Sequence, residues 1–175
     1  NNAIHDYDMF ENMGLRDTVI QTQIAQITQN LPNLPNRLAS FFILANAHAE
    51  LGEFDESIKY CRHIIEMGSD PIEANLNLGL FCMNAGRNEE AIAAYNTVLE
   101  LDPEHSHAYN NLGTLFEQDG EKKRAQAYYE QAVLLDPDLA MAHFNLARLH
   151  MSSGAVDSAM FAYTTVLKLD PEYIP

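Results

Sequence analysis

Residues 72–105 read IEANLNLGLFCMNAGRNEEAIAAYNTVLELDPEH, and residues 106–139 read SHAYNNLGTLFEQDGEKKRAQAYYEQAVLLDPDL. Both segments carry Asn-Leu-Gly near the start, a single Gly in the middle, Ala and Tyr one helical turn apart, and Asp-Pro near the end. Several independent positions that recur at one spacing indicate an internal repeat, which is the first pattern to test in a sequence.

The 34-residue spacing extends beyond this pair in both directions. The recurring positions are Gly52, Gly86, Gly120 and Gly154; Ala45, Gly79, Gly113 and Ala147; Ser57, Ala91, Ala125 and Ala159; Cys61, Tyr95, Tyr129 and Tyr163; and Pro103, Pro137 and Pro171. The first copy departs most from the pattern, and its closing turn is expected to use Gly68-Ser69-Asp70-Pro71.

Each copy predicts two helices, here 72–84 and 88–101. Gly86 follows the first helix, where the left-handed conformation suits glycine. Asn88 is expected to cap the second helix by accepting hydrogen bonds from free N–H groups. Pro103 lacks an N–H and restricts the residue before it, so the second helix is expected to end near residue 101.

The pattern resembles the tetratricopeptide repeat (TPR) family, through Asn-Leu-Gly at 77–79 and 111–113, Asn-Leu-Ala at 145–147, and the Ala, Tyr and Pro positions above. The resemblance implies an all-α fold, a right-handed α-solenoid of helix-turn-helix repeats whose first helices line a concave groove. Repeats are placed at 38–71, 72–105, 106–139 and 140–173. Each unit is expected to bury its apolar face on its neighbour.

Residues 1–37 do not fit the full motif. Apolar residues within 17–31 follow a helical period at Ile20, Ile24, Ile27 and Leu31, and Leu31-Pro-Asn-Leu-Pro35 then interrupts the helix. We interpret 1–37 as a helical cap or degenerate half-repeat that covers repeat 1. The alternative is a segment that folds back into the groove.

The sequence stops at Pro175, where a further first helix would begin. Terminal repeats normally need a polar outer face, so Val166 and Leu169 are expected to be partly exposed. Two interpretations stay open: the natural protein continues as a longer chain, or arrays stack end to end as a homo-oligomer.

Composition restricts the class of protein. With 47% hydrophobic residues, general disorder is excluded. A formal net charge of −15 repels phosphate backbones and argues against nucleic-acid binding. No apolar run approaches a membrane span, and residues 1–10 show no secretory signal. Two cysteines are too few for a disulfide framework, so reduced thiols and a cytoplasmic location are favoured.

If the TPR resemblance holds, the first helices supply the residues that contact a ligand. Asn77, Asn111 and Asn145 recur at the repeat spacing, and each amide can match the N–H and C=O of one peptide unit. Similar ladders bind peptides in some TPR proteins, including the O-linked glycosyltransferase that carries this repeat. The candidate peptide-binding residues are Phe42, Asn46, Leu76, Asn77, Leu80, Met83, His107, Asn110, Asn111, Met141, Phe144, Asn145 and Arg148.

Other interpretations of these residues stay open. The Asn side chains could bond only within the array, and the methionines could simply pack between first helices. Binding of chaperone C-termini is disfavoured, because Phe42, His107 and Asn111 stand where a carboxylate clamp places Lys or Arg.

The remaining polar features favour structural roles. Histidines such as His143 and His150 occupy places where the family usually packs aromatic side chains, so no metal site is assigned. Cys61 and Cys82 are expected in the core, and Lys122-Lys123-Arg124 is expected on a solvated face. No catalytic constellation or cofactor motif is found. We therefore predict a non-enzymatic protein-interaction module, with a self-associating scaffold or the recruiting arm of a larger enzyme, such as a glycosyltransferase, as alternatives.

Overall fold

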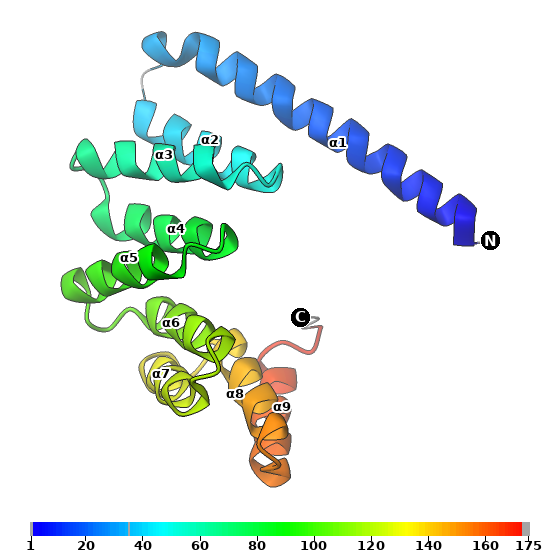
Figure 1. The fold of residues 1–175 in the computed structure, drawn as a ribbon, viewed down its shortest axis with the longest axis vertical. Coiled ribbons are helices and arrows are strands. Elements are labelled where there is room, and N and C mark those ends of the chain that lie inside the picture. The colour runs from blue at the N-terminus through cyan, green and yellow to red at the C-terminus, as the bar shows by residue number, and fades with distance from the viewer. Residues whose placement is uncertain (1, 35, 173–175) are drawn as a thin grey trace. The chain divides into compact units, whose positions relative to one another are not determined.

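A computed structural model describes residues 2–34 and 36–172, with side chains from residue 14 onward. Pro35 and residues 173–175 lie outside the described residues, as does the side chain of every residue before Gly14. The elements in the described part are α1 (Asn2–Asn30), the 3-10 helix η1 (Leu31–Asn33), α2 (Arg37–Glu50), α3 (Phe54–Glu66), α4 (Pro71–Asn84), α5 (Asn88–Leu101), α6 (Ser106–Gln118), α7 (Lys122–Leu135), α8 (Ala140–Ser152) and α9 (Val156–Leu169). This order confirms the predicted all-α fold (Figure 1).

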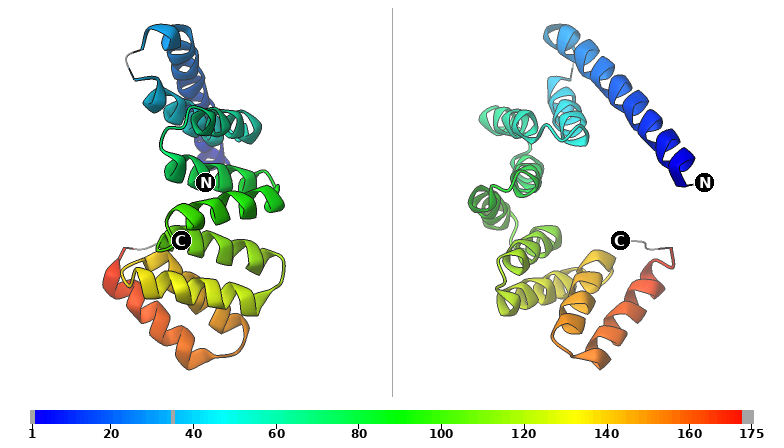
Figure 2. Two further views of the ribbon diagram at one scale, coloured as in Figure 1. Left: turned by 90° about the vertical axis from the view of Figure 1, so that its left-hand side faces the viewer. Right: turned by 45° about the vertical axis from the view of Figure 1, so that its right-hand side comes forward.

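The chain divides into two compact units, Asn1–Gly86 and Arg87–Pro175. In the first unit α3 packs against both α2 and α4, and α1 contacts α2. In the second unit α6 pairs with α7 and α8 pairs with α9, while α5 packs on α6 and α7 packs on α8. The two helical pairs of the second unit are visible in both views of Figure 2.

The core of the first unit draws on every α-helix in it. Phe41 and Leu44 of α2, Ile64 of α3 and Ala74 of α4 form a buried cluster. The predicted apolar stripe packs against this cluster through three partly buried side chains, Ile24, Ile27 and Leu31. The helix that carries the stripe begins at Asn2, far earlier than the segment 17–31 that the stripe defines.

The second unit has its core inside the helical pairs. Leu112, Leu115, Tyr129 and Ala147 are completely buried. Val166 is only 3% exposed, so the expectation that it would be partly exposed is wrong. It lies on a helix whose main neighbour is α8, and that pairing buries it. Leu169, in contrast, is half-buried.

The turns within the repeats confirm the glycine positions. Gly52, Gly86, Gly120 and Gly154 all have positive φ, between 73° and 79°. Since a side chain in that conformation costs roughly 1–2 kcal/mol, glycine is the residue that closes each first helix at least cost.

The predicted cap at Asn88 is wrong. Arg87 occupies the N-cap position of α5 and no side chain caps that end, whereas Asn88 is the first helical residue. From there the Asn88 amide nitrogen donates to Asp119 Oδ1 at 3.5 Å. The helix thus begins one residue earlier than a cap at Asn88 requires. The Asn88 side chain instead reaches Asp119, in the turn between α6 and α7.

Candidate functional site

A cluster of amides joins α6 to α8 in the second unit. Asn110 on α6 is only 1% exposed, and its Oδ1 accepts a hydrogen bond from Asn145 Nδ2 on α8 at 2.9 Å. The Asn110 amide nitrogen approaches Met141 Sδ at 3.3 Å and Asn111 Oδ1 at 3.4 Å. Asn111 and Asn145 are themselves half-buried. The buried amide of Asn110 therefore fixes the orientation of predicted ligand-binding side chains on both helices.

A second polar cluster lies one to two turns farther along the same helices. Arg148 of α8 donates to Glu117 Oε2 of α6 at 2.7 Å, and Tyr129 of α7 donates to the same oxygen at 2.9 Å. The Tyr129 hydroxyl also lies 3.3 Å from Thr114 Oγ1. The Glu117 side chain is 14% exposed and that of Arg148 is 48% exposed. Arg148 is thus anchored at one edge and open to solvent at the other.

Burial keeps the hydroxyl of Tyr129 protonated. Its ring is completely buried, and this desolvation raises the pKa of the phenol well above its usual value. The hydroxyl is consequently a proton donor to Glu117 throughout the neutral range. Neither Glu117 nor Tyr129 was among the predicted site residues. The sequence did contain a signal for Glu117: the equivalent positions one repeat before and after it are Met83 and Met151, so a charged residue stands where the neighbouring repeats have an apolar one.

In the first unit, α2 and α4 carry the other candidates. Asn77 Nδ2 donates to Glu73 Oε1, one turn earlier on α4, at 2.9 Å. Leu76 and Met83 are half-buried and Leu80 is 37% exposed. On α2 the Asn46 side chain is exposed.

The other predicted residues lie outside the two polar clusters. Phe42 of α2 packs against the core cluster of the first unit. His107 is exposed at the start of α6, with its ring 6.0 Å from that of His105. Phe144 is half-buried and its ring lies 5.8 Å from that of Tyr163. The predicted residues that the structure brings together by contact are thus Asn110, Asn111, Met141 and Asn145.

Both cysteines are buried, as predicted. Burial, together with the nearby Cys82 and Glu73, raises the pKa of the Cys61 thiol to about 12. A protonated, buried thiol is a poor nucleophile and metal ligand. Among the described residues, no three His, Cys, Asp or Glu side chains are placed to hold a metal ion.

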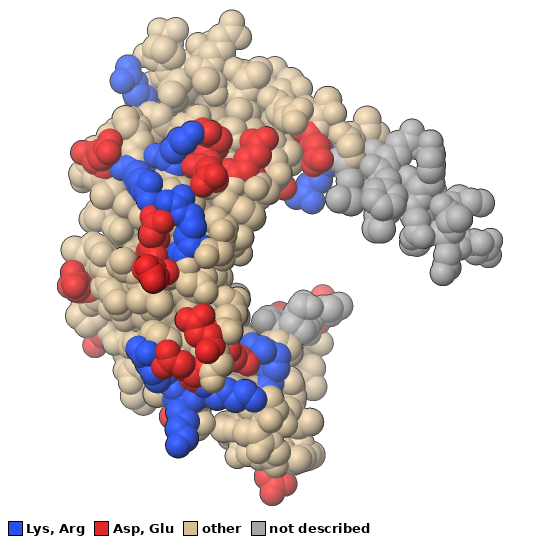
Figure 3. All heavy atoms as spheres, in the orientation of Figure 1, with Lys and Arg blue, Asp and Glu red and all other residues tan. Residues whose placement is uncertain are grey.

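Several basic side chains form ion pairs with acidic ones. On the face shown in Figure 3, most of the Lys and Arg side chains adjoin Asp or Glu side chains. The pairs include Arg16 with Glu50 and Arg124 with Glu121, at 2.7 and 2.8 Å. The Lys122-Lys123-Arg124 segment begins α7, and Arg124 also lies over the Phe116 ring, 3.7 Å from its centroid.

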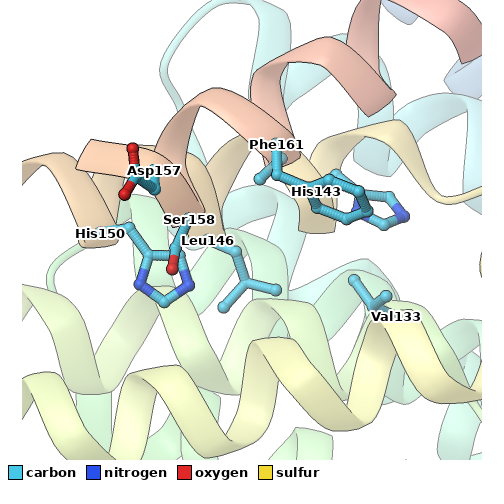
Figure 4. Close-up of a pocket in the computed structure, with 8 residues that line it drawn as sticks. Val133, His143, Leu146, His150, Asp157, Ser158 and Phe161 are labelled. Atoms are coloured by element: carbon cyan, nitrogen blue, oxygen red, sulfur yellow. The ribbon is translucent and has the colours of Figure 1, made fainter. Parts of the chain in front are cut away.

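A hollow of about 500 Å³ opens between α7, α8 and α9 (Figure 4). The residues that line it are Val133, His143, Leu146, His150, Asp157, Ser158, Phe161 and Ala162. His143 is 9% exposed and its Nε2 lies 2.9 Å from the carbonyl oxygen of Pro137, whereas Phe161 is 75% exposed. The sequence patterns did not predict this hollow.

Comparison with known proteins decides the family. Three family models described as tetratricopeptide repeat match residues 38–69, 70–133 and 110–174. The chain belongs to the tetratricopeptide repeat family. No curated protein sequence matches it.

Solved structures share the fold of this TPR chain. "Crystal structure of MamA" has a TM-score of 0.69 at 20% identity and covers 87% of this chain and 90% of that chain. "MamA 41-end from Desulfovibrio magneticus RS-1" has a TM-score of 0.71 at 17% identity, with coverages of 97% and 96%. TTC0263, a thermophilic TPR protein in Thermus thermophilus, has a TM-score of 0.72 at 18% identity, with coverages of 92% and 90%.

The family gives the broad function. TPR chains are protein-interaction scaffolds that bind protein partners, and the fold is generally a non-catalytic module. No α-helix of the described residues has the length and apolar character of a membrane span. The predicted repeat boundaries at 38–71, 72–105, 106–139 and 140–173, and the assignment of 1–37, stay predictions.

Proposed function

We propose that this TPR chain binds an extended segment of a partner protein along its first helices, through asparagine amides that pair with the segment's backbone. In the second unit the contact residues are Asn111 and Asn145, flanked by Met141 and Arg148. In the first unit, considered by itself, Asn77 and Leu80 of α4 are candidate contacts of the same kind.

The observation that carries the proposal is the bond between Asn145 and Asn110. A free amide side chain loses rotamer freedom when it binds, and a side chain already fixed by a buried partner loses less. The bond uses one N–H of Asn145. Its second N–H and its carbonyl oxygen can then pair with one peptide unit.

Apolar contacts complete the proposed surface. Met141 and Leu80 are 45% and 37% exposed, although both are large apolar side chains. Methionine adapts its shape to different neighbours, so Met141 would receive different partner side chains. Sequence preference would come from such contacts, because backbone pairing by amides is independent of sequence.

The test begins with a random 12-residue peptide library selected against the whole chain. A selected peptide is expected to shift the backbone NMR signals of α6 and α8, and Asn145→Ala should weaken its binding about tenfold, the equivalent of about 1.4 kcal/mol. Asn96→Ala serves as the matched control, because Asn96 is an exposed asparagine on the second helix α5.

Two results would contradict the proposal. One is a set of selected peptides that leaves α6 and α8 unperturbed. The other is equal binding by the Asn145→Ala, Asn111→Ala and Asn96→Ala variants, which would show that the amides do not contact the peptide.

Self-association is a second candidate function, favoured by one observation. Met160 and Leu167 of α9 are 62% and 58% exposed, which leaves apolar surface on that helix open to another protein. Light scattering across a concentration series tests it. A mass that stays monomeric at high-micromolar protein would exclude it.

A further inference from the structure

Two of the helical pairs contain an aromatic stack at equivalent positions, two repeats apart. In α2–α3, the ring of Tyr60 stacks on His48, with centroids 5.6 Å apart and planes at 22°, and lies 6.0 Å from Phe41. The second helix therefore provides a ring that fills the space between two rings of the first helix.

The α6–α7 pair repeats this arrangement. The ring of Tyr128 stacks on Phe116, with centroids 5.1 Å apart and planes at 11°, and lies 6.2 Å from Tyr109. Arg124 also lies over the Phe116 ring, 3.7 Å from its centroid. Here too the ring at the centre of the stack comes from the second helix of the pair.

The α8–α9 pair lacks the residues that fill this space in the other two pairs. One repeat after the four positions of the α6–α7 stack stand His143, His150, Ser158 and Ala162. Alanine stands at the position of the central tyrosine, and serine stands at the position of the arginine. All four of these residues line the hollow of about 500 Å³. The hollow is therefore the place where the α2–α3 and α6–α7 pairs each hold a tyrosine ring.

The walls of the hollow provide aromatic and aliphatic surface on which a ring can pack. Two imidazoles, His143 and His150, remain on α8, while Val133 and Leu146 supply aliphatic surface (Figure 4). Three of the residues that line the hollow, Asp157, Ser158 and Phe161, are exposed, so the hollow is open to solvent. Its volume falls within the roughly 300–1,000 Å³ of ordinary ligand pockets.

We propose that this hollow binds an aromatic side chain, of the tyrosine type, from a partner protein. The incoming ring takes the place of Tyr128 in the α6–α7 pair and stacks on His150, as Tyr60 stacks on His48. Phe161 closes over its edge, since aromatic rings favour offset-stacked and edge-to-face contacts. The site is separate from the amide cluster and from the second polar cluster, and it does not depend on the function proposed above.

The test uses two capped tripeptides, acetyl-Gly-Tyr-Gly-amide and acetyl-Gly-Leu-Gly-amide, titrated into the whole chain and followed by NMR. The tyrosine peptide is expected to shift the imidazole C–H signals of His143 and His150 upfield in a saturable way. The leucine peptide should bind at least fivefold more weakly, because it cannot stack.

The decisive variant is Ala162→Tyr, which restores the ring that the α2–α3 and α6–α7 pairs carry. It should reduce binding of the tyrosine peptide at least tenfold and raise the thermal midpoint. Thr164→Tyr is the matched control, since it adds the same ring to α9 at an exposed position outside the hollow. His150→Ala provides a second test by removing the stacking surface without filling the hollow, and it should also weaken binding.

Three outcomes would overturn the proposal. The first is equal binding of the two tripeptides, and the second is undiminished binding of the tyrosine peptide by both Ala162→Tyr and His150→Ala. The third is a concentration-dependent dimer that Ala162→Tyr dissociates, which would make a second copy of the chain the occupant of the hollow.

Discussion

Replacing Tyr129 by Phe removes one hydroxyl and keeps the buried ring that packs against Gly113 of α6. That hydroxyl donates to Glu117 Oε2 at 2.9 Å and lies 3.3 Å from Thr114 Oγ1, in a residue with no exposed surface. The change therefore tests the anchoring of Glu117, and through it the position of Arg148, with little effect on packing.

The magnitude follows from the bond that is lost. A hydrogen bond to a charged group contributes about 1.5–3 kcal/mol to stability. Glu117 keeps its bond to Arg148 at 2.7 Å, so the carboxylate is not left without a partner, and the lower part of this range applies. We expect Tyr129→Phe to lower the free energy of unfolding by about 2 kcal/mol and the thermal midpoint by several degrees.

Urea unfolding followed by circular dichroism measures this loss, and Tyr163→Phe is the matched control at the equivalent place in α9. Tyr163 is half-buried, so its variant should stay within about 0.5 kcal/mol of the parent protein. A Tyr129→Phe variant that is equally unaffected would show that the bond to Glu117 is replaced by water at no cost. The reasoning about the second polar cluster would then be refuted.

Three further predictions concern the fold. A Cβ at Gly113 would lie 2.6 Å from two ring atoms of Tyr129, so Gly113→Ala should destabilise the chain by about 1–3 kcal/mol in urea unfolding, although Ala favours helix; a gain in stability would contradict this. Gly120 has a φ of 79°, and Gly120→Ala should lower the unfolding free energy by about 1–2 kcal/mol; an unchanged urea midpoint would contradict that. Burial raises the pKa of Cys61 from 9 to about 12, so its thiol form stabilises the folded state below pH 9, and this contribution is lost as the pH rises towards 12. Mass spectrometry should therefore find Cys61 unmodified by iodoacetamide at pH 8 until the chain is unfolded. Rapid alkylation of the folded chain would contradict this.

The repeat predicted the helices well because its regular spacing marks the residues at which helices end. A glycine at a positive φ closes the first helix of a repeat and a proline follows the second, and both act on the backbone locally. The predicted helix 88–101 accordingly matches α5 to the residue. The stripe in 17–31 indicated a helix but not its start at Asn2. Val166 was misassigned because its burial depends on the pairing of α9 with α8.

The candidate site was harder to predict, because neighbouring residues of one type can have different surroundings. Asn110 and Asn111 are consecutive, yet the first is 1% exposed and the second is half-buried. A turn of about 100° per residue along a helix separates their side chains, and no sequence pattern tells which of two adjacent amides is the buried one. The hollow was similarly missed, because its recognition requires Ala162 and Ser158 to be compared with the same positions one repeat earlier.

The buried amide leads to a last prediction about binding. Asn110 is almost fully enclosed, so it is expected to act as a positioning residue that holds Asn145 at 2.9 Å. Asn110→Ala should therefore weaken binding of a library-selected peptide about as much as Asn145→Ala, and the double variant should lose little more than either single one, because the two changes remove the same arrangement. Asn77 donates to Glu73, one turn earlier on its own helix in the first unit, so Asn77→Ala is expected to leave binding to α6 and α8 unchanged. Isothermal titration calorimetry of the three single variants and the Asn110→Ala/Asn145→Ala double variant measures the coupling. If the losses of binding free energy from Asn110→Ala and Asn145→Ala are additive, each amide acts independently. The hydrogen bond between Asn110 and Asn145 would then not orient Asn145 for binding.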